Sequence, residues 1–99
     1  MSYVVLPEFL VEAQNLDAFL KAARDDAECS VAQEQGCRQF DVIVDREASP
    51  IKVMFYEIYD DRAAFERHLE TPHLARFRAH LGLVKEGPVM FFDRVVAPQ

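Results

Sequence analysis

Residues 55–77 read FYEIYDDRAAFERHLETPHLARF, and this stretch decides the fold. A strand-like aromatic run comes first, and Asp60 or Asp61 then offers an N-cap for a short helix. Thr71 and Pro72 interrupt that helix, because proline disfavours a helical conformation for the residue before it yet fits the first turn of a new helix. The stretch therefore predicts one strand followed by two short helices.

The segments before this stretch predict a hairpin and an earlier strand. Residues 51–59, IKVMFYEIY, extend the aromatic run into a full strand. Residues 37–45, CRQFDVIVD, alternate well enough to pair with it through the turn EASP. Residues 3–11 form an apolar strand-like run in which Pro7 suits an edge strand or a bulge. Three strands therefore precede the two short helices.

Helical periodicity and one more apolar run complete the order of elements. A long amphipathic helix follows Asn15 as N-cap and ends by Gly36, a residue type that is common just past a helix. The apolar stripe after the Thr-Pro break consists of His73, Leu74, Phe77, His80, Leu81 and Val84 and ends near Gly87. Residues 89–97, VMFFDRVVA, are the last strand. The order β-α-β-β-α-β over residues 1–99 predicts a single α+β domain of the ferredoxin-like, split β-α-β type.

Both faces of the predicted sheet carry apolar side chains. Alternation along the third strand places Val53, Phe55 and Tyr59 on one face and Met54, Tyr56 and Ile58 on the other, and the last strand alternates in the same way. Helices cover only one face of the sheet in this topology, and soluble monomers rarely expose a large apolar patch. We therefore expect a homodimer with two-fold symmetry that joins the uncovered faces of two sheets.

Composition and charge exclude several classes of function. The 99 residues carry a net charge of −6 with a pI near 4.9, which leaves no basic stripe for nucleic acid. No apolar run approaches the roughly 20 residues that cross a bilayer, and the first residues, MSYVVLPEFLVE, lack the basic start of a signal peptide. We therefore expect a cytoplasmic protein without a membrane partner, in which Cys29 and Cys37 are free thiols and Cys37 is buried.

Two stretches of the chain carry a resemblance to a known family. Residues 34–42, EQGCRQFDV, and residues 55–77, with their aromatic-Glu-x-aromatic run and TPH segment, are similar to the antibiotic biosynthesis monooxygenase-like family. That family includes quinol monooxygenases and the phospho-autoinducer-2 isomerase. The resemblance covers nearly the whole chain and implies a dimeric α+β barrel with an apolar cavity between the sheet and the helices of each subunit. It does not define the reaction, because one fold hosts many activities.

The chain departs from the pattern of this family at two points. Many members carry an asparagine on the first helix at the position where this chain has Ala27. The chain also contains no tryptophan, a residue on which the haem-degrading relatives rely. The resemblance therefore disfavours haem breakdown, and an assignment of quinol oxidation loses some support.

Three polar residues are the candidates for catalysis. His73 lies in the opening turn of a helix, where the partial positive charge disfavours an added proton, so we expect a neutral imidazole that can accept a proton from a substrate. Glu57 alternates with aromatic residues and needs a partner in the core. Arg38, Arg78 and His68 are its candidate partners. His68, the third catalytic candidate, lies on the inward side of its helix, and each of the three also has a purely structural interpretation.

Aromatic side chains offer a lining for a substrate pocket, although most rings in so small a domain belong to the core. The residues that we expect at the pocket are Phe40, Phe55, Tyr59, Phe65, Phe77 and Arg78. We expect no metal, because His68 and His73 flank a helix break and lack the i, i+4 spacing of a helical zinc pair. The glycines form no dinucleotide or phosphate loop, so we expect no cofactor.

Three functions fit these features. The leading hypothesis is a cofactor-independent monooxygenase, in which His73, with Glu57, removes a proton from a small phenol, quinol or polyketide-like ring and the anion then reduces O₂. The second is an isomerase of a small phosphorylated dicarbonyl compound, with the helix start at Pro72 and either Arg38 or Arg78 meeting the phosphate. The third is a dimeric module that binds a hydrophobic metabolite without turnover.

Overall fold

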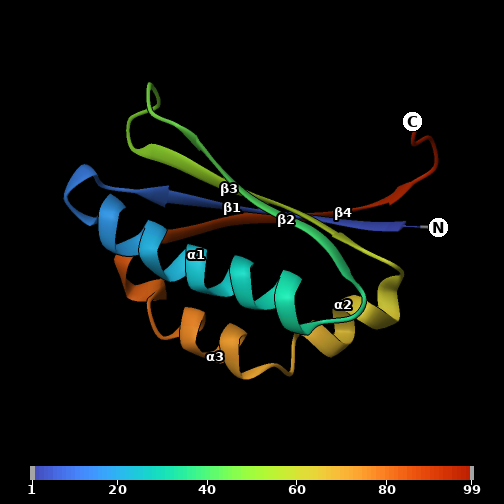
Figure 1. Cartoon of the computed structure of the whole chain (residues 1–99). Coiled ribbons are helices and arrows are strands. Elements are labelled where there is room, and N and C mark those ends of the chain that lie inside the picture. Colours follow the sequence, from blue (N-terminus) through green and yellow to red (C-terminus); the bar gives the residue numbers. More distant parts are fainter. Residues whose placement is uncertain (1, 99) are drawn as a thin grey trace.

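An antiparallel sheet with the helices on one of its faces forms the fold in the computed structural model, which describes residues 2–98 (Figure 1). Along the chain the elements are β1 (Ser2–Val11), η1 (Ala13–Asn15), α1 (Leu16–Gln33), β2 (Cys37–Asp45), β3 (Ile51–Tyr59), α2 (Arg62–His68), α3 (Pro72–Arg78), η2 (Leu81–Leu83) and β4 (Lys85–Arg94), where η1 and η2 are short 3-10 helices. The strand order in the sheet is β2-β3-β1-β4. This order confirms the predicted α+β, ferredoxin-like fold.

The last strand differs in part from its predicted form, whereas the first strand adopts one of the two forms predicted for it, the bulge. β4 begins at Lys85 and not at residue 89, so Gly87–Pro88 lies inside the strand and does not precede it. β4 is an edge strand, where proline is tolerated because its missing N–H leaves no neighbour unpaired. β1 is a central strand, so Pro7 is not at an edge. It lies at a bulge, because the register between β1 and β4 shifts between Pro7 and Phe9.

The residues predicted to begin and end α1, Asn15 and Gly36, have other roles in the structure. Asn15 precedes the helix, but its side chain makes no cap hydrogen bond, and its Nδ2 donates instead to the carbonyl oxygen of Leu83 at 3.1 Å. Gly36 does not adopt the left-handed conformation of a helix-ending glycine. Its small size is needed for packing, because a Cβ at this position would lie 2.6 Å from the Cβ of Ala64 on α2. Gly36 thus lets the end of α1 approach α2.

The Thr-Pro break forms the two short helices that the sequence predicts. Asp61 caps α2 and Thr71 caps α3, each by accepting a hydrogen bond from the backbone N–H three residues further on. Pro72 is the first residue of α3. The predicted apolar stripe does not continue in one helix, because α3 ends at Arg78 and His80 is exposed.

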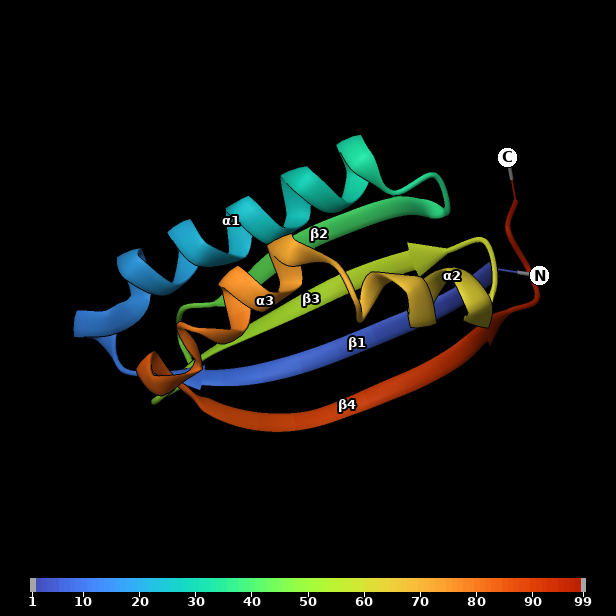
Figure 2. The same cartoon turned by 90° about the horizontal axis from the view of Figure 1, so that it is seen from below.

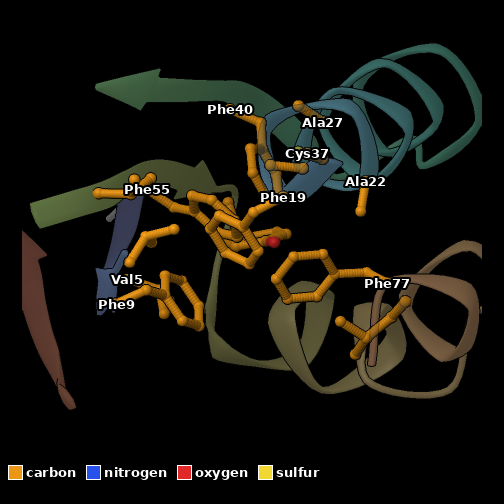
Figure 3. Close-up of a cluster of buried hydrophobic side chains, with 14 of the residues drawn as sticks. Val5, Phe9, Phe19, Ala22, Ala27, Cys37, Phe40, Phe55 and Phe77 are labelled. Carbon is orange, nitrogen blue, oxygen red and sulfur yellow. The ribbon is translucent and has the colours of Figure 1, made fainter. Parts of the chain in front are cut away.

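Phenylalanine rings fill the space between the sheet and the helices, as Figure 3 shows. Phe9 and Phe55 come from the sheet, Phe19 from α1 and Phe77 from α3, and their ring centroids lie 4.9 to 6.4 Å apart. These separations and tilts are those that aromatic pairs prefer. Cys37 is buried beside this cluster, and both cysteines are free thiols, as the sequence predicts.

The opposite face of the sheet has no helix over it, as the two views in Figures 1 and 2 agree. The large exposed apolar residues on this face are Ile43 on β2, Tyr56 on β3 and Met90 and Phe92 on β4. The helix-covered face of β3 carries the core residues Val53, Phe55 and Tyr59, which confirms the predicted alternation. Within residues 2–98, no helix is both long and apolar enough to span a bilayer.

Candidate functional site

One carboxylate joins the ends of three helices. Glu34 is the C-cap that follows α1, His68 is the last residue of α2, and His73 is the second residue of α3. The Oε2 atom of Glu34 lies 2.7 Å from Nδ1 of His68 and 2.5 Å from Nε2 of His73. Both imidazoles are only 2% exposed. The three side chains therefore form a network that is largely removed from water.

The break between α2 and α3 positions the two histidines. The hydroxyl of Thr71, which caps α3, also donates a hydrogen bond to the carbonyl oxygen of His68 at 2.8 Å. The centroids of the His68 and His73 rings lie 5.9 Å apart. In a continuous helix, residues five positions apart would point to clearly different faces. The break is therefore what allows both rings to reach Glu34.

The hydrogen bonds to Glu34 determine which nitrogen of each neutral ring carries the proton. An imidazole nitrogen that bonds to a carboxylate donates an N–H. His68 then has its proton on Nδ1 and a lone pair on Nε2, whereas His73 has its proton on Nε2 and a lone pair on Nδ1. Nδ1 of His73 is buried and has no hydrogen-bond partner among residues 2–98. A proton added to this atom would form a buried donor without an acceptor.

A second carboxylate approaches the histidines from the inner face of α1. Asp26 is 1% exposed, and its Oδ1 accepts a hydrogen bond from Oγ of Ser30 at 3.3 Å. One side-chain nitrogen or oxygen atom from each of Asp26, His68 and His73 lies within 4.8 Å of the other two. Burial raises the pKa of Asp26 to about 6, although the two histidines oppose this shift.

A third carboxyl group, that of Glu57, belongs to β3 and lies on the face of the sheet that the helices cover. It is 3% exposed, and its Oε1 accepts a hydrogen bond from the hydroxyl of Tyr59 at 2.6 Å. Burial raises the pKa of Glu57 to about 8; the Tyr59 hydrogen bond opposes this shift, and the charges of Asp26 and Glu34 add to it. Glu57 is therefore mostly protonated at neutral pH.

The partner of Glu57 is a tyrosine and not one of the basic residues that the sequence suggests. Nε of Arg38 lies 2.5 Å from Oδ1 of Asp60 in an exposed ion pair, and His68 bonds to a different carboxylate. Tyr59 is fully buried, and both burial and the adjacent Glu57 raise the pKa of its hydroxyl. The hydroxyl of Tyr59 donates to the carboxyl group and so favours its ionised form, but burial raises the pKa by more than this hydrogen bond lowers it.

A cavity of about 140 Å³ lies between the sheet and the short helices. Its apolar wall includes rings from the sheet, from α2 and from α3. Three of the buried polar residues described above also line it, namely Asp26, Glu57 and His68. The cavity thus combines an aromatic lining with titratable groups that are shielded from bulk water.

The residues predicted for the pocket divide into two groups. Those that line the cavity are Phe55, Phe65, Phe77 and Arg78. Phe40 and Tyr59 do not line it. Phe40 packs against Phe55 with a ring separation of 5.2 Å, and Tyr59 holds Glu57 from within the core. Phe40 and Tyr59 therefore support the cavity wall and do not form its surface.

The three catalytic candidates likewise occupy two positions. Glu57 and His68 line the cavity, whereas His73 does not and joins the network through Glu34. The sequence predicts no role for Asp26 or for Glu34. Asp26 had a recognisable signal, because it falls one turn after buried alanines on the inner face of α1. Glu34 begins the stretch 34–42 that carries the family resemblance, but its contacts join distant segments, and no local pattern predicts those contacts.

Comparisons with known proteins agree with this fold. A family model described as "Antibiotic biosynthesis monooxygenase" matches residues 2–80. The structure of a Nitrosomonas europaea protein, named "Putative antibiotic biosynthesis monooxygenase", is similar with a TM-score of 0.86 and 25% sequence identity, over 95% of this chain and 90% of that chain. A protein from Caulobacter crescentus CB15 with the same name gives a TM-score of 0.86 at 20% identity, over 96% of this chain and 91% of that chain.

A further solved structure, named an antibiotic biosynthesis monooxygenase, is 26% identical to the chain with a TM-score of 0.80, over 97% of this chain and 100% of that chain. The comparison with curated proteins gives no significant match. The family match spans β1 to the end of α3 and includes all the polar residues of the network described above. The chain therefore belongs to the antibiotic biosynthesis monooxygenase family.

Proposed function

We propose that the protein is a cofactor-independent monooxygenase that acts on a small aromatic compound with an ionisable hydroxyl, such as a phenol or a quinol. The observation that carries this proposal is that His68 and Glu57 line the same aromatic cavity. The surroundings of His68 suit it to accept a proton, and those of Glu57 suit it to donate a hydrogen bond. Membership of the family supports the choice of oxygen chemistry among the reactions that such a pair can assist.

In this proposal His68 is the base. Its Nδ1 is engaged by Glu34, so Nε2 holds the lone pair that a substrate in the cavity can reach. The carboxylate orients the ring and stabilises the positive charge that the ring gains when it accepts a proton. His73 donates to the same oxygen atom and fixes Glu34 in place. His73 is thus a positioning residue.

Glu57 has the complementary role of a hydrogen-bond donor. Since burial raises its pKa to about 8, most of the carboxyl groups carry a proton at pH 7. A protonated carboxyl group can donate to a substrate oxygen on which negative charge develops. Removal of a proton from a weakly acidic hydroxyl near neutral pH requires such a base and such a donor in one site.

The oxidation uses O₂ and electrons from the substrate. The substrate anion gives one electron to O₂, and the superoxide and substrate radical then combine by forming a C–O bond at a ring carbon. The proton held by His68 moves to the peroxide, and loss of the hydrogen on that carbon breaks the O–O bond. One oxygen atom remains as a new carbonyl, and the other leaves in water with the hydroxyl hydrogen and the ring hydrogen. The apolar wall of the cavity favours recombination of the radical pair.

The volume of the cavity suits a small substrate. A cavity of roughly 150 Å³ in another protein holds benzene, and the cavity here measures about 140 Å³. We therefore propose a compound with one ring and not a fused polyketide. Its hydroxyl would lie beside Nε2 of His68, with the ring against the aromatic wall.

A phosphorylated dicarbonyl substrate fits the same cavity less well. Arg78 lines the wall, but so do the acidic residues Glu8, Asp26, Glu57 and Glu86. A dianionic phosphate would meet more acidic than basic side chains there. Arg38, the other candidate for the phosphate, is engaged by Asp60 outside the cavity. The isomerase and the binding module are the two alternatives that experiments must distinguish from the monooxygenase.

Oxygen uptake with a panel of one-ring phenols and quinols tests the proposal. We expect uptake that matches product formation, with one atom of ¹⁸O₂ in the product. His68→Gln should lower kcat by about 10²- to 10⁴-fold, the usual contribution of a general base. Glu57→Gln should cause a smaller loss, because the amide still donates a hydrogen bond. His80→Gln is the matched control, since His80 is exposed and is not among the residues that line the cavity.

The alternatives predict different results in the same experiments. Proton exchange at a substrate carbon in heavy water without O₂ would support the isomerase and contradict the monooxygenase. Ligand binding without any turnover would leave only the binding module. For His73→Gln, a positioning role predicts a lower kcat with an almost unchanged KM and a displaced pH profile, whereas a merely structural role would change the melting temperature alone.

We also propose that the protein forms a homodimer through the uncovered face of its sheet. Ile43, Tyr56, Met90 and Phe92 form an exposed apolar surface on that face. Soluble monomers rarely expose such a surface, and a two-fold axis would bury it against a second copy. Light scattering should show a dimer for the wild type and a monomer for Phe92→Glu. Val31→Glu, which changes an exposed apolar residue on α1, should remain dimeric.

A further inference from the structure

We propose that Asp26, His68 and His73 bind a divalent transition-metal ion of the zinc type, with one coordination position open to the cavity. All three side chains are buried, and one ligand atom from each lies within 4.8 Å of the other two. The sequence argues against a metal only through the spacing of the histidines in a helix. The break at Thr71 removes this objection, because tertiary structure and not helical spacing brings the rings together.

The residue types match the chemistry of such an ion. Imidazole and carboxylate are ordinary zinc ligands, and sites with three protein ligands keep a fourth position for water or another small ligand. With metal–ligand bonds of about 2.0–2.2 Å, tetrahedral ligand atoms lie about 3.4 Å apart. The present separations reach this value through side-chain movements on the order of 1 Å. Asp26 and His68 line the cavity, so the fourth position would face it.

Two features of the histidines point to a ligand. Nδ1 of His73 is buried with a free lone pair and has no hydrogen-bond partner among the described residues. Histidines that bind metals usually donate their other ring N–H to a carboxylate, which fixes the tautomer. Glu34 accepts such a bond from both His68 and His73.

The charges around the cluster also favour a cation. Asp26 and Glu34 lie in or beside the core, and within residues 2–98 their side-chain hydrogen bonds come from a hydroxyl group and from imidazoles. Buried carboxylates without a cationic partner are unfavourable. A divalent ion is often the largest local charge in a site and compensates nearby acidic groups. The cluster thus provides both the ligands and the negative potential that a metal ion requires.

Calorimetric titration of the chelator-treated full chain with Zn²⁺ tests the proposal. We expect one ion per chain. Asp26→Asn preserves the shape of the side chain but removes its charge, and it should weaken binding more than Glu34→Gln does. For Glu34→Gln we expect a loss of about 10- to 100-fold, as for other carboxylates that orient a metal-binding histidine. His80→Gln and Cys29→Ser should bind like the wild type, because both residues lie outside the cluster.

A second measurement keeps the test decisive if a variant folds poorly. In the wild type, NMR resonances of the imidazole nitrogens of His68 and His73 should shift on addition of Zn²⁺, and those of His80 should not. Co²⁺ should give an absorption spectrum without a thiolate-to-metal band. Binding that survives in Asp26→Asn and His73→Gln, or that disappears in His80→Gln, would overturn the proposal.

The metal site shares His68 with the proposed monooxygenase site, but the two proposals can be tested separately. Zinc binding is measured without a substrate, so it can be found in a protein that turns nothing over. If both proposals hold, Zn²⁺ should inhibit oxygen uptake, because the ion occupies the histidine that acts as the base. Oxygen uptake that persists at saturating, calorimetrically verified Zn²⁺ would contradict the location of the ion at His68.

Discussion

Two acid–base contacts of equal length differ in their surroundings. Arg38 and Asp60 approach to 2.5 Å with side chains that are 62% and 43% exposed, whereas Glu34 and His73 approach to 2.5 Å with side chains that are 12% and 2% exposed. Water competes for both partners of the exposed pair. No water reaches the buried contact freely, so each partner depends on the other for its hydrogen bond. Burial, and not distance, therefore determines which of the two contacts contributes to the stability of the fold.

The buried network links folding to chemistry for the same reason. Glu34 holds the last residue of α2 and the first turn of α3 against the end of α1. By accepting both hydrogen bonds it also fixes the lone pairs on the two rings. The residues that stabilise the packing of the short helices are thus the ones that prepare the site.

The largest expected effect comes from loss of the shared carboxylate. Glu34→Ala leaves two buried N–H groups without their acceptor, at about 1–3 kcal/mol for each group, so we expect the free energy of unfolding to fall by about 2–6 kcal/mol. Urea denaturation measures this change. Glu28→Ala, on the exposed face of the same helix, is the control and should unfold like the wild type. Equal stability of the two variants would show that the network contributes nothing.

The next effect concerns pH. The pKa of Glu57 rises from 4.5 to about 8 in the folded protein, so between these values the folded state holds a proton that the unfolded state releases. The free energy of unfolding should therefore be highest at the acidic end of this range and fall, by about 2–4 kcal/mol, as the pH rises through 8. Asp26, whose pKa is about 6, adds a change of the same sign at lower pH.

Urea denaturation between pH 5 and pH 8.5 measures this dependence. Glu57→Gln keeps an acceptor for the Tyr59 hydroxyl but cannot titrate, so its stability should depend much less on pH. An unchanged slope in the Gln variant would assign the effect to other groups. An opposite slope in the wild type would contradict the raised pKa.

A smaller loss of stability should follow from a substitution that pushes α2 away from the end of α1 and leaves the polar residues of the network unchanged. Gly36→Ala places a Cβ 2.6 Å from the Cβ of Ala64 on α2, the helix that carries His68. Such overpacking costs about 1–3 kcal/mol. Gly82→Ala is the matched control, because its Cβ would meet nothing within 4 Å. In a double-mutant cycle with Ala64→Gly, the combined loss should be smaller than the sum, and simple additivity would locate the strain elsewhere.

Local signals explain which parts of the fold follow from the sequence. β2 and β3 begin and end where their alternation predicts, and Thr71 and Pro72 start α3 as their chemistry requires. Each of these features depends on residues that are close in sequence. β4 was predicted to start too late, because Gly87 and Pro88 usually break a strand and only their place at a sheet edge permits them here.

The candidate site depends on contacts that local patterns do not contain. The two bonds of Glu34 span 34 and 39 residues. Asn15 shows the same limit, because a partner 68 residues away engages the side chain that was predicted to cap α1. His68 and Glu57 were recognised as polar residues in apolar surroundings, which is a local signal. Their hydrogen-bond partners, Tyr59 and Glu34, follow from the folded structure and not from the local pattern.

The smallest change in stability is expected from loss of the exposed ion pair between Arg38 and Asp60. Arg38→Ala removes a contact with Asp60 that lowers the pKa of that carboxyl group, yet both side chains are largely in water. Solvent screens such a pair, and ordering two flexible side chains offsets the attraction. We expect the melting temperature of Arg38→Ala to match that of the wild type, in low salt and in high salt. A clear loss of stability would mean that contact distance outweighs burial in this protein, which would reverse the interpretation of the Glu34 network as well.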